Sequence, residues 1–172
     1  MSHVYEEVKR RAELLEKLEL AIPGYRGYKE KELRREADRL IRQHLLDRLR
    51  PAQRNLKSVM PVIAASGDSN LAQLYNQIQA VFDRVVAKLR TASYGYSGFF
   101  DAVKIREAEL DRMLEFDWGL VEAVDRVVKA ADTVAKSEPG KLAEALSALR
   151  GELLAFEDLL AKRDEVIRGI LA

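Results

Sequence analysis

The sequence of 172 residues contains no cysteine and only two histidines, His3 and His44. The lack of cysteine excludes disulfides, thiolate metal sites and cysteine nucleophiles, and it is compatible with the reducing cytoplasm. Helical metal sites commonly use a Glu-x-x-His pair, but residue 41, three before His44, is isoleucine. We therefore expect no metal, no cofactor and no catalytic residue, and we interpret His44 as a partly buried structural histidine.

Long hydrophobic runs are also missing. The longest apolar stretch covers roughly residues 59–65 and contains Pro61, whereas a membrane-spanning helix needs about 20 apolar residues. The first residues lack the pattern of a secretory signal. We expect a cytoplasmic protein without a transmembrane segment.

An excess of charge of either sign is absent, since the net charge is +1. Residues 1–60 nevertheless hold 15 Lys and Arg against 10 Asp and Glu, and residues 61–172 hold 14 against 18, so the two parts carry +5 and −4. The sequence pI of about 7.9 is below that of a dedicated nucleic-acid domain. The length predicts a single helical domain over residues 1–172.

Strand-like alternation does not occur, and apolar residues recur instead at helical spacing. This pattern predicts an all-α protein, an elongated antiparallel up-down bundle of about five helices. The expected helices cover about 3–20, 29–65, 71–91, 99–136 and 142–170. Since the apolar face of the second helix continues across Pro51, we expect one long helix with a kink there; a true break at Pro51 is the alternative.

The last expected helix has the most regular pattern. Its apolar positions step alternately by four and three residues, as in a coiled coil, and Arg163 interrupts this seam once. The seam packs either inside the bundle or against a second copy. A buried arginine is unfavourable without a carboxylate partner, so we expect Arg163 to pair with Asp or Glu of another helix, at a bundle end or a dimer interface.

Two segments rich in glycine and tyrosine interrupt the helices, at residues 23–28 and 94–99. If the helices alternate in direction, both segments lie at one end of the bundle. Glycine allows close approach of the backbone, and tyrosine combines an apolar ring with a polar tip, so the two loops suit recognition of a partner. The alternative is that they only end helices and cap the core. The candidate partner-binding residues are Tyr25, Arg26, Tyr28, Tyr94, Tyr96 and Phe99.

The second helix also carries stripes of basic residues. A ladder of alternating charge, Glu30, Arg34, Asp38 and Arg42, is typical of a solvated helix face. Like charges that follow one another at helical spacing are unfavourable unless an anionic partner or acidic residues of the same chain neutralise them. The candidate anion-binding residues are Lys31, Arg35, Arg39, Arg50, Arg54 and Lys57.

These features predict a non-catalytic helical protein-interaction module, an adaptor or scaffold, that uses the two Gly-Tyr loops and possible homodimer contacts. The alternative is binding of nucleic acid or an anionic surface through the basic stripes. A third possibility is a helical enzyme or ligand-binding bundle with a pocket between the loop ends.

Overall fold

The computed structural model describes residues 2–91 and 106–171, and over these residues the chain is all-α, with no strand. Short 3₁₀ turns at Lys31–Leu33 and Pro139–Lys141 precede two of the helices. The α-helices are α1 (Ser2–Ala21), α2 (Arg34–Lys57), α3 (Met60–Ser66), α4 (Ser69–Arg90), α6 (Glu107–Lys136) and α7 (Leu142–Leu171). The expected all-α fold is therefore confirmed.

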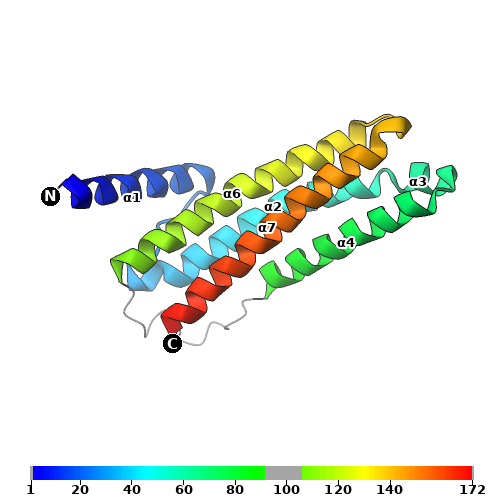
Figure 1. Cartoon of the computed structure of the whole chain (residues 1–172). Coiled ribbons are helices and arrows are strands. Elements are labelled where there is room, and N and C mark those ends of the chain that lie inside the picture. The colour runs from blue at the N-terminus through cyan, green and yellow to red at the C-terminus, as the bar shows by residue number, and fades with distance from the viewer. Residues whose placement is uncertain (1, 92–105, 172) are drawn as a thin grey trace.

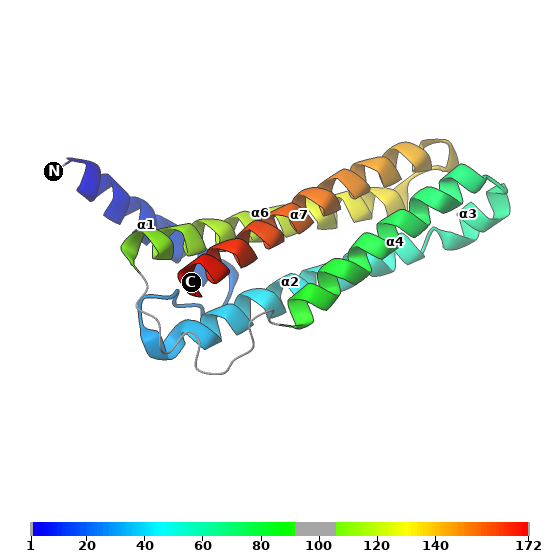
Figure 2. The same ribbon diagram turned by 60° about the horizontal axis from the view of Figure 1, so that its bottom comes forward.

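Four long helices form an elongated bundle (Figures 1 and 2). Chain direction alternates from α2 to α4, α6 and α7, so that α2 with α4 and α6 with α7 form two antiparallel pairs. These pairs pack side by side, and α2 lies along α6 while α4 lies along α7. Ion pairs between Arg48 and Asp125 and between Arg84 and Glu157 cross these two contacts.

The expected coiled-coil seam packs inside the bundle. Its described members, from Leu142 through Leu146, Leu149, Leu153, Phe156 and Leu160 to Ile167, are at most 4% exposed. The other three bundle helices supply matching buried residues such as Ile41, Phe82 and Val124. The heptad pattern is thus used to fill the core of one chain.

The long second helix ends earlier than expected. Helix α2 continues through Pro51, so the alternative of a break at this proline is wrong. The interruption lies instead at Ser58 and Val59, and the next helix, α3, has Pro61 in its first turn. Proline lacks an N–H and is tolerated in a first helical turn, which explains why the helix restarts just before Pro61.

The turn between the second and third expected helices lies at the end of the bundle opposite the N-terminus (Figure 1). Gly67 closes α3 with φ of 67°, a left-handed conformation that favours glycine. The Asp68 carboxylate accepts hydrogen bonds from the backbone N–H groups of Asn70 and Leu71, at 3.0 and 3.2 Å. This N-cap starts α4, since aspartate is one of the residues preferred at a helix N-cap.

Helix α1 packs on the outside of the four long helices. Its principal contacts are with α6, and later residues of α1 meet later residues of α6: Arg11 pairs with Asp111, and Lys17 lies over Trp118. The two helices therefore run parallel. Figure 1 shows the first turns of α1 projecting past the start of α6.

Among the described residues, no helix combines the length and the apolar character needed to cross a membrane.

Candidate functional site

The projecting part of α1, residues 2–8, is named here the α1 arm. Its large apolar residues Val4, Tyr5 and Val8 are 65, 68 and 51% exposed. Val4 and Val8 are separated from Leu15 and Leu18 by the spacings of one helix face, and Leu18 is fully buried. The same apolar stripe that attaches α1 to α6 therefore continues onto the arm. The arm itself projects beyond the start of α6 (Figure 1).

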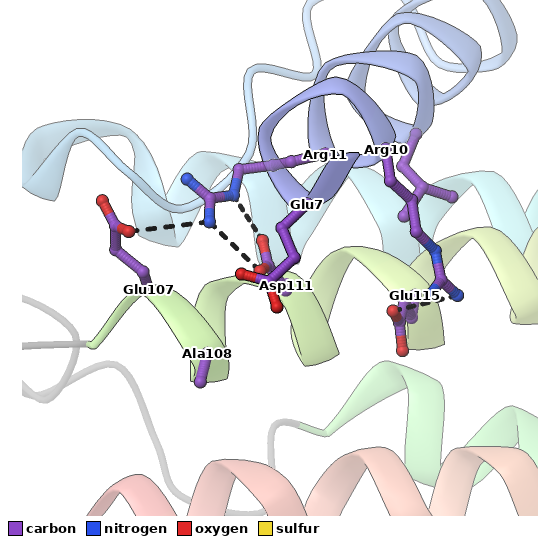
Figure 3. A pocket seen from close by; sticks show the side chains of 8 residues that line it. Glu7, Arg10, Arg11, Glu107, Ala108, Asp111 and Glu115 are labelled. Atoms are coloured by element: carbon purple, nitrogen blue, oxygen red, sulfur yellow. Dashed lines mark hydrogen bonds and ion pairs between the residues drawn. The ribbon is translucent and has the colours of Figure 1, made fainter. Parts of the chain in front are cut away.

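Ion pairs that follow the arm along α1 hold this helix to the first turns of α6. Arg11 donates to both carboxylate oxygens of Asp111, with Nη2 at 3.1 Å from Oδ2, and lies 3.8 Å from Glu107. The hydrogen bond from Arg11 to Asp111 raises the pKa of the guanidinium, and burial opposes it. Arg10 pairs with Glu115 at 3.1 Å. Figure 3 shows these side chains lining a hollow between α1 and α6.

The loop that follows α1 turns sharply to reach α2. Gly24 and Gly27 have φ of 88° and 74°. A Cβ at Gly27 would lie 3.3 Å from a Leu15 methyl group and 3.5 Å from a Leu114 methyl group. Gly27 thus combines a left-handed backbone with close packing between α1 and α6. This conformation directs the flanking Tyr25 and Tyr28 into the bundle, where both are 1% exposed.

Beneath this loop lies a buried polar network. The hydroxyls of Tyr25 and Tyr28 donate to Asp117 Oδ2 at 2.7 and 2.6 Å, and Arg163 Nε donates to Asp117 Oδ1 at 2.6 Å. Arg163 Nη2 also donates to the Tyr28 hydroxyl at 2.8 Å and to Asp38 Oδ1 at 3.0 Å. The network therefore joins the loop to α2, α6 and α7.

The network extends along α2. Arg42 Nε donates to the other oxygen of Asp38 at 3.0 Å, and Arg42 Nη1 donates to the carbonyl of Leu89 at 3.1 Å. Arg34 Nε donates to the carbonyl of Tyr28 at 2.8 Å. Asp38 and Asp117 are 0% exposed and Arg163 is 2% exposed. Charges so deeply buried require this degree of pairing and hydrogen bonding.

Two predictions about charge have different outcomes. Arg163 pairs with carboxylates of other helices, as expected, and its partners belong to the same chain. The interpretation of the α2 ladder as a solvated face is wrong, because Arg34 and Asp38 are 6% and 0% exposed. These two members of the ladder point into the bundle, where the Arg163 side chain of α7 reaches Asp38.

The expectation that Tyr25 and Tyr28 form an exposed contact surface is also wrong. Burial of both rings agrees with the alternative, that this loop caps the core. Arg26 is exposed, and its role in partner binding stays a prediction. Tyr94, Tyr96 and Phe99 lie outside the described residues, so the meeting of the two Gly-Tyr loops also stays a prediction.

The basic stripes of α2 are partly neutralised by neighbouring acids. Arg39 makes two hydrogen bonds to Glu36, at 3.0 and 2.6 Å, and this contact lowers the pKa of Glu36. Arg50 lies 3.5 Å from Asp47. Arg35 is half-buried, and Lys31, Arg54 and Lys57 are exposed. These pairs agree with internal neutralisation for part of the stripes, and anion binding stays a prediction.

His44 is half-buried on α2, and burial lowers the pKa of its imidazole. Its position agrees with the interpretation as a structural histidine. Within residues 2–91 and 106–171, no three His, Asp or Glu side chains gather in a way that could hold a metal ion.

The exposed α1 arm was not predicted from the sequence. In the sequence, Val4 and Val8 continue the apolar stripe of Leu15 and Leu18, so the spacing alone does not distinguish them from residues that pack on the bundle. No signal in the sequence marks the arm, because its exposure depends on the register between α1 and α6, whose ion pairs begin at Arg10. Compared with protein-family models, curated proteins and solved structures, the chain matches none of them.

Because Tyr25 and Tyr28 are buried, we expect their hydroxyls to ionise at higher pH than the hydroxyls of exposed tyrosines. Burial, followed by the negative charge of Asp117, raises the pKa of Tyr25 well above 10, and burial likewise raises that of Tyr28. The folded state retains these protons above pH 10 while the unfolded state loses them, so each tyrosine makes stability fall as pH rises beyond the unfolded pKa.

Ultraviolet absorbance of tyrosinate during a pH titration checks this. We expect part of the signal to appear only when the helix signal in circular dichroism is lost, and Tyr25→Phe/Tyr28→Phe to remove that part. Full ionisation of the wild type while the protein is still folded would contradict the buried network.

Proposed function

We propose that the protein is a non-catalytic helical interaction module that contacts a partner protein through the α1 arm. The observation that carries this proposal is the exposure of Val4, Tyr5 and Val8 on a helix that projects beyond the bundle. Large apolar side chains gathered on one exposed element commonly mark a protein-protein contact. The Gly-Tyr loop at residues 23–28 serves this function as the anchor of α1, since its tyrosines are hydrogen-bonded in the core.

Helix energetics support the same proposal. A short isolated helix is marginal in water, and most helical stability in proteins comes from packing of an apolar face. Further along, α1 has such packing against α6, where Leu18 is buried, but every residue of the arm is exposed. A partner that covers the exposed part of Val4 and Val8 would gain roughly 1 kcal/mol for each side chain.

The buried network favours a structural role over a catalytic one. Asp117, Asp38 and Arg163 are the groups whose chemistry a reaction would use, yet they are at most 2% exposed. Each also makes hydrogen bonds with its neighbours in the core. A substrate would have to displace this network to reach them. A possible homodimer and a cytoplasmic location, both expected from the sequence, remain part of this proposal.

The test compares an arm variant with a matched surface variant. Val4→Ser/Val8→Ser removes the exposed stripe, and Leu20→Ser changes an 80% exposed residue on another side of the same helix. We expect the arm variant to reduce recovery of chemically cross-linked partners at least tenfold and the Leu20 variant to leave it unchanged. Both variants should keep the stability of the wild type within about 0.5 kcal/mol, since the changed residues are exposed.

Light scattering across a range of protein concentrations distinguishes a second copy from another partner. If the arm mediates a homodimer, the mass of the wild type rises with concentration and that of the arm variant does not. Equal recovery of cross-linked partners by all three proteins would contradict the proposal.

A further inference from the structure

The hollow between α1 and the first turns of α6 carries an excess of negative charge. It has a volume of about 230 Å³ and opens at the base of the α1 arm (Figure 3). Four carboxylates and two guanidiniums line it, which leaves two negative charges in excess. These charged residues are Glu7, Glu107, Asp111, Glu115, Arg10 and Arg11.

Both cations of the hollow are already engaged there. The Arg11 side chain is 20% exposed and is held by Asp111 and Glu107, and Arg10 pairs with Glu115. The Glu107 side chain, by contrast, is 81% exposed. Figure 3 shows Glu7 pointing from α1 into the hollow. The Arg10 side chain is 71% exposed but is paired with Glu115, so the net charge that an approaching molecule meets is that of the two carboxylates in excess.

The apolar arm borders this acidic hollow. Helical geometry places Glu7 beside Val4, since residues three apart are neighbours on a helix surface, and at the edge of the stripe that Val4 forms with Val8. The side of the arm that faces the hollow thus presents an apolar stripe with carboxylates beside it. Such a surface complements a helix that has apolar residues on one face and lysine or arginine at its edge.

We propose that the α1 arm and the adjoining acidic hollow bind a basic amphipathic helix of a partner protein. This inference rests on the proposed function and adds the chemistry of the partner. Apolar residues of the partner helix cover Val4 and Val8, while its basic residues meet Glu7 and Glu107. A helix with acidic edges would place like charges together and bind more weakly.

Two synthetic helical peptides of equal length test the charge preference. Both carry leucine at heptad positions; one has lysine and the other glutamate at the flanking positions. Fluorescence anisotropy of the labelled peptides measures the dissociation constants. We expect the lysine peptide to bind wild type at least tenfold more tightly at low salt, with a smaller ratio at high salt because ions screen exposed charges.

Three variants locate the binding. Glu7→Gln/Glu107→Gln should reduce the preference for the lysine peptide about fivefold, since it neutralises two exposed charges. Val4→Ser/Val8→Ser should weaken binding of the lysine peptide at least tenfold. Glu13→Gln, roughly 120° around the helix from Glu7, is the matched control and should change neither value.

Each contrary result has its own meaning. Equal binding of both peptides, with weakening by Val4→Ser/Val8→Ser, overturns the basic partner but leaves the arm as a contact surface. Binding that is indifferent to the arm variant, or no binding, overturns both proposals. Self-association that only the arm variant abolishes also overturns the basic partner, because a second copy of this chain then covers the arm.

Discussion

Replacement of Arg163 by methionine is expected to lower the free energy of unfolding by about 3–5 kcal/mol. Arg163 is the shared cation of two carboxylates, Asp117 and Asp38, and both are 0% exposed. Methionine leaves these negative charges buried without that cation, and loss of one member of a buried ion pair has a cost of this size. Equilibrium unfolding in urea, followed by circular dichroism, measures the change.

A surface pair provides the control for this prediction. Arg84 also makes two hydrogen bonds to a carboxylate, that of Glu157, but its side chain is 52% exposed. Arg84→Met should therefore lower stability by less than about 1 kcal/mol. If the two methionine variants were equally stable, the burial of Arg163 would not be the cause of its importance.

Lysine at position 163 should not restore stability. The guanidinium reaches Asp117 through Nε and both Asp38 and Tyr28 through Nη2, so it bridges three acceptors with its planar fork. A lysine ammonium is a single point charge and cannot reproduce this geometry. Neutralisation of the acids together with the cation should recover part of the loss, because Arg163→Met/Asp117→Asn buries one negative charge fewer than Arg163→Met.

The seam of α7 shows which features of a buried ion pair can be predicted from a sequence pattern and which cannot. Its period places Arg163 at a seam position, and a cation there needs an anion, so the pattern predicted the kind of partner. The expected place was a bundle end or a dimer interface, whereas Arg163 is buried within one chain. The pattern did not identify Asp117 or Asp38, because contacts between helices depend on their relative register. Nothing in the spacing of α6 distinguishes Asp117 from an exposed aspartate.

The ladder of α2 shows the opposite case. Glu30, Arg34, Asp38 and Arg42 have the spacing of surface ion pairs, and local spacing alone favours a solvated face. The face is buried around Arg34 and Asp38 because α7 presents Arg163 to it from more than 100 residues away. A long-range contact thus determines whether the same local pattern is exposed or buried.

Helix ends were predictable where a local chemical signal marks them. Asp68 and Gly67 produce the turn before α4 by capping and by a left-handed backbone, and both effects depend on one or two residues. Helix α2 continues through Pro51, as expected from the apolar face that crosses this proline, and the interruption that was not expected lies next to Pro61. The exposed arm had no local signal at all, since its residues continue a core-facing stripe.

Alanine at Tyr28 is expected to lower the free energy of unfolding by about 3–5 kcal/mol. The ring is fully packed, and truncation of a large buried aromatic side chain has a cost of this order. Alanine also removes the hydroxyl that donates to Asp117 and accepts from Arg163. Tyr25→Ala should have a similar effect, because its ring is equally buried and packs edge-on against Tyr28 at 6.2 Å between centroids.

A phenylalanine variant separates the contribution of the Tyr28 ring to stability from that of its hydroxyl. Tyr28→Phe keeps the packing and removes only the hydrogen bonds, two of which involve charged groups, so a loss of about 1.5–3 kcal/mol is expected. Thermal and urea unfolding of the alanine and phenylalanine variants give both contributions. The hypothesis of a recognition surface requires the reverse, a Tyr25 or Tyr28 alanine variant that unfolds like wild type and fails only to bind.

Since these hydroxyls tie the loop after α1 to α6 and α7, we expect Tyr28→Ala also to loosen the part of α1 that follows the arm. This effect is measurable as faster amide exchange in residues 11–18 than in wild type.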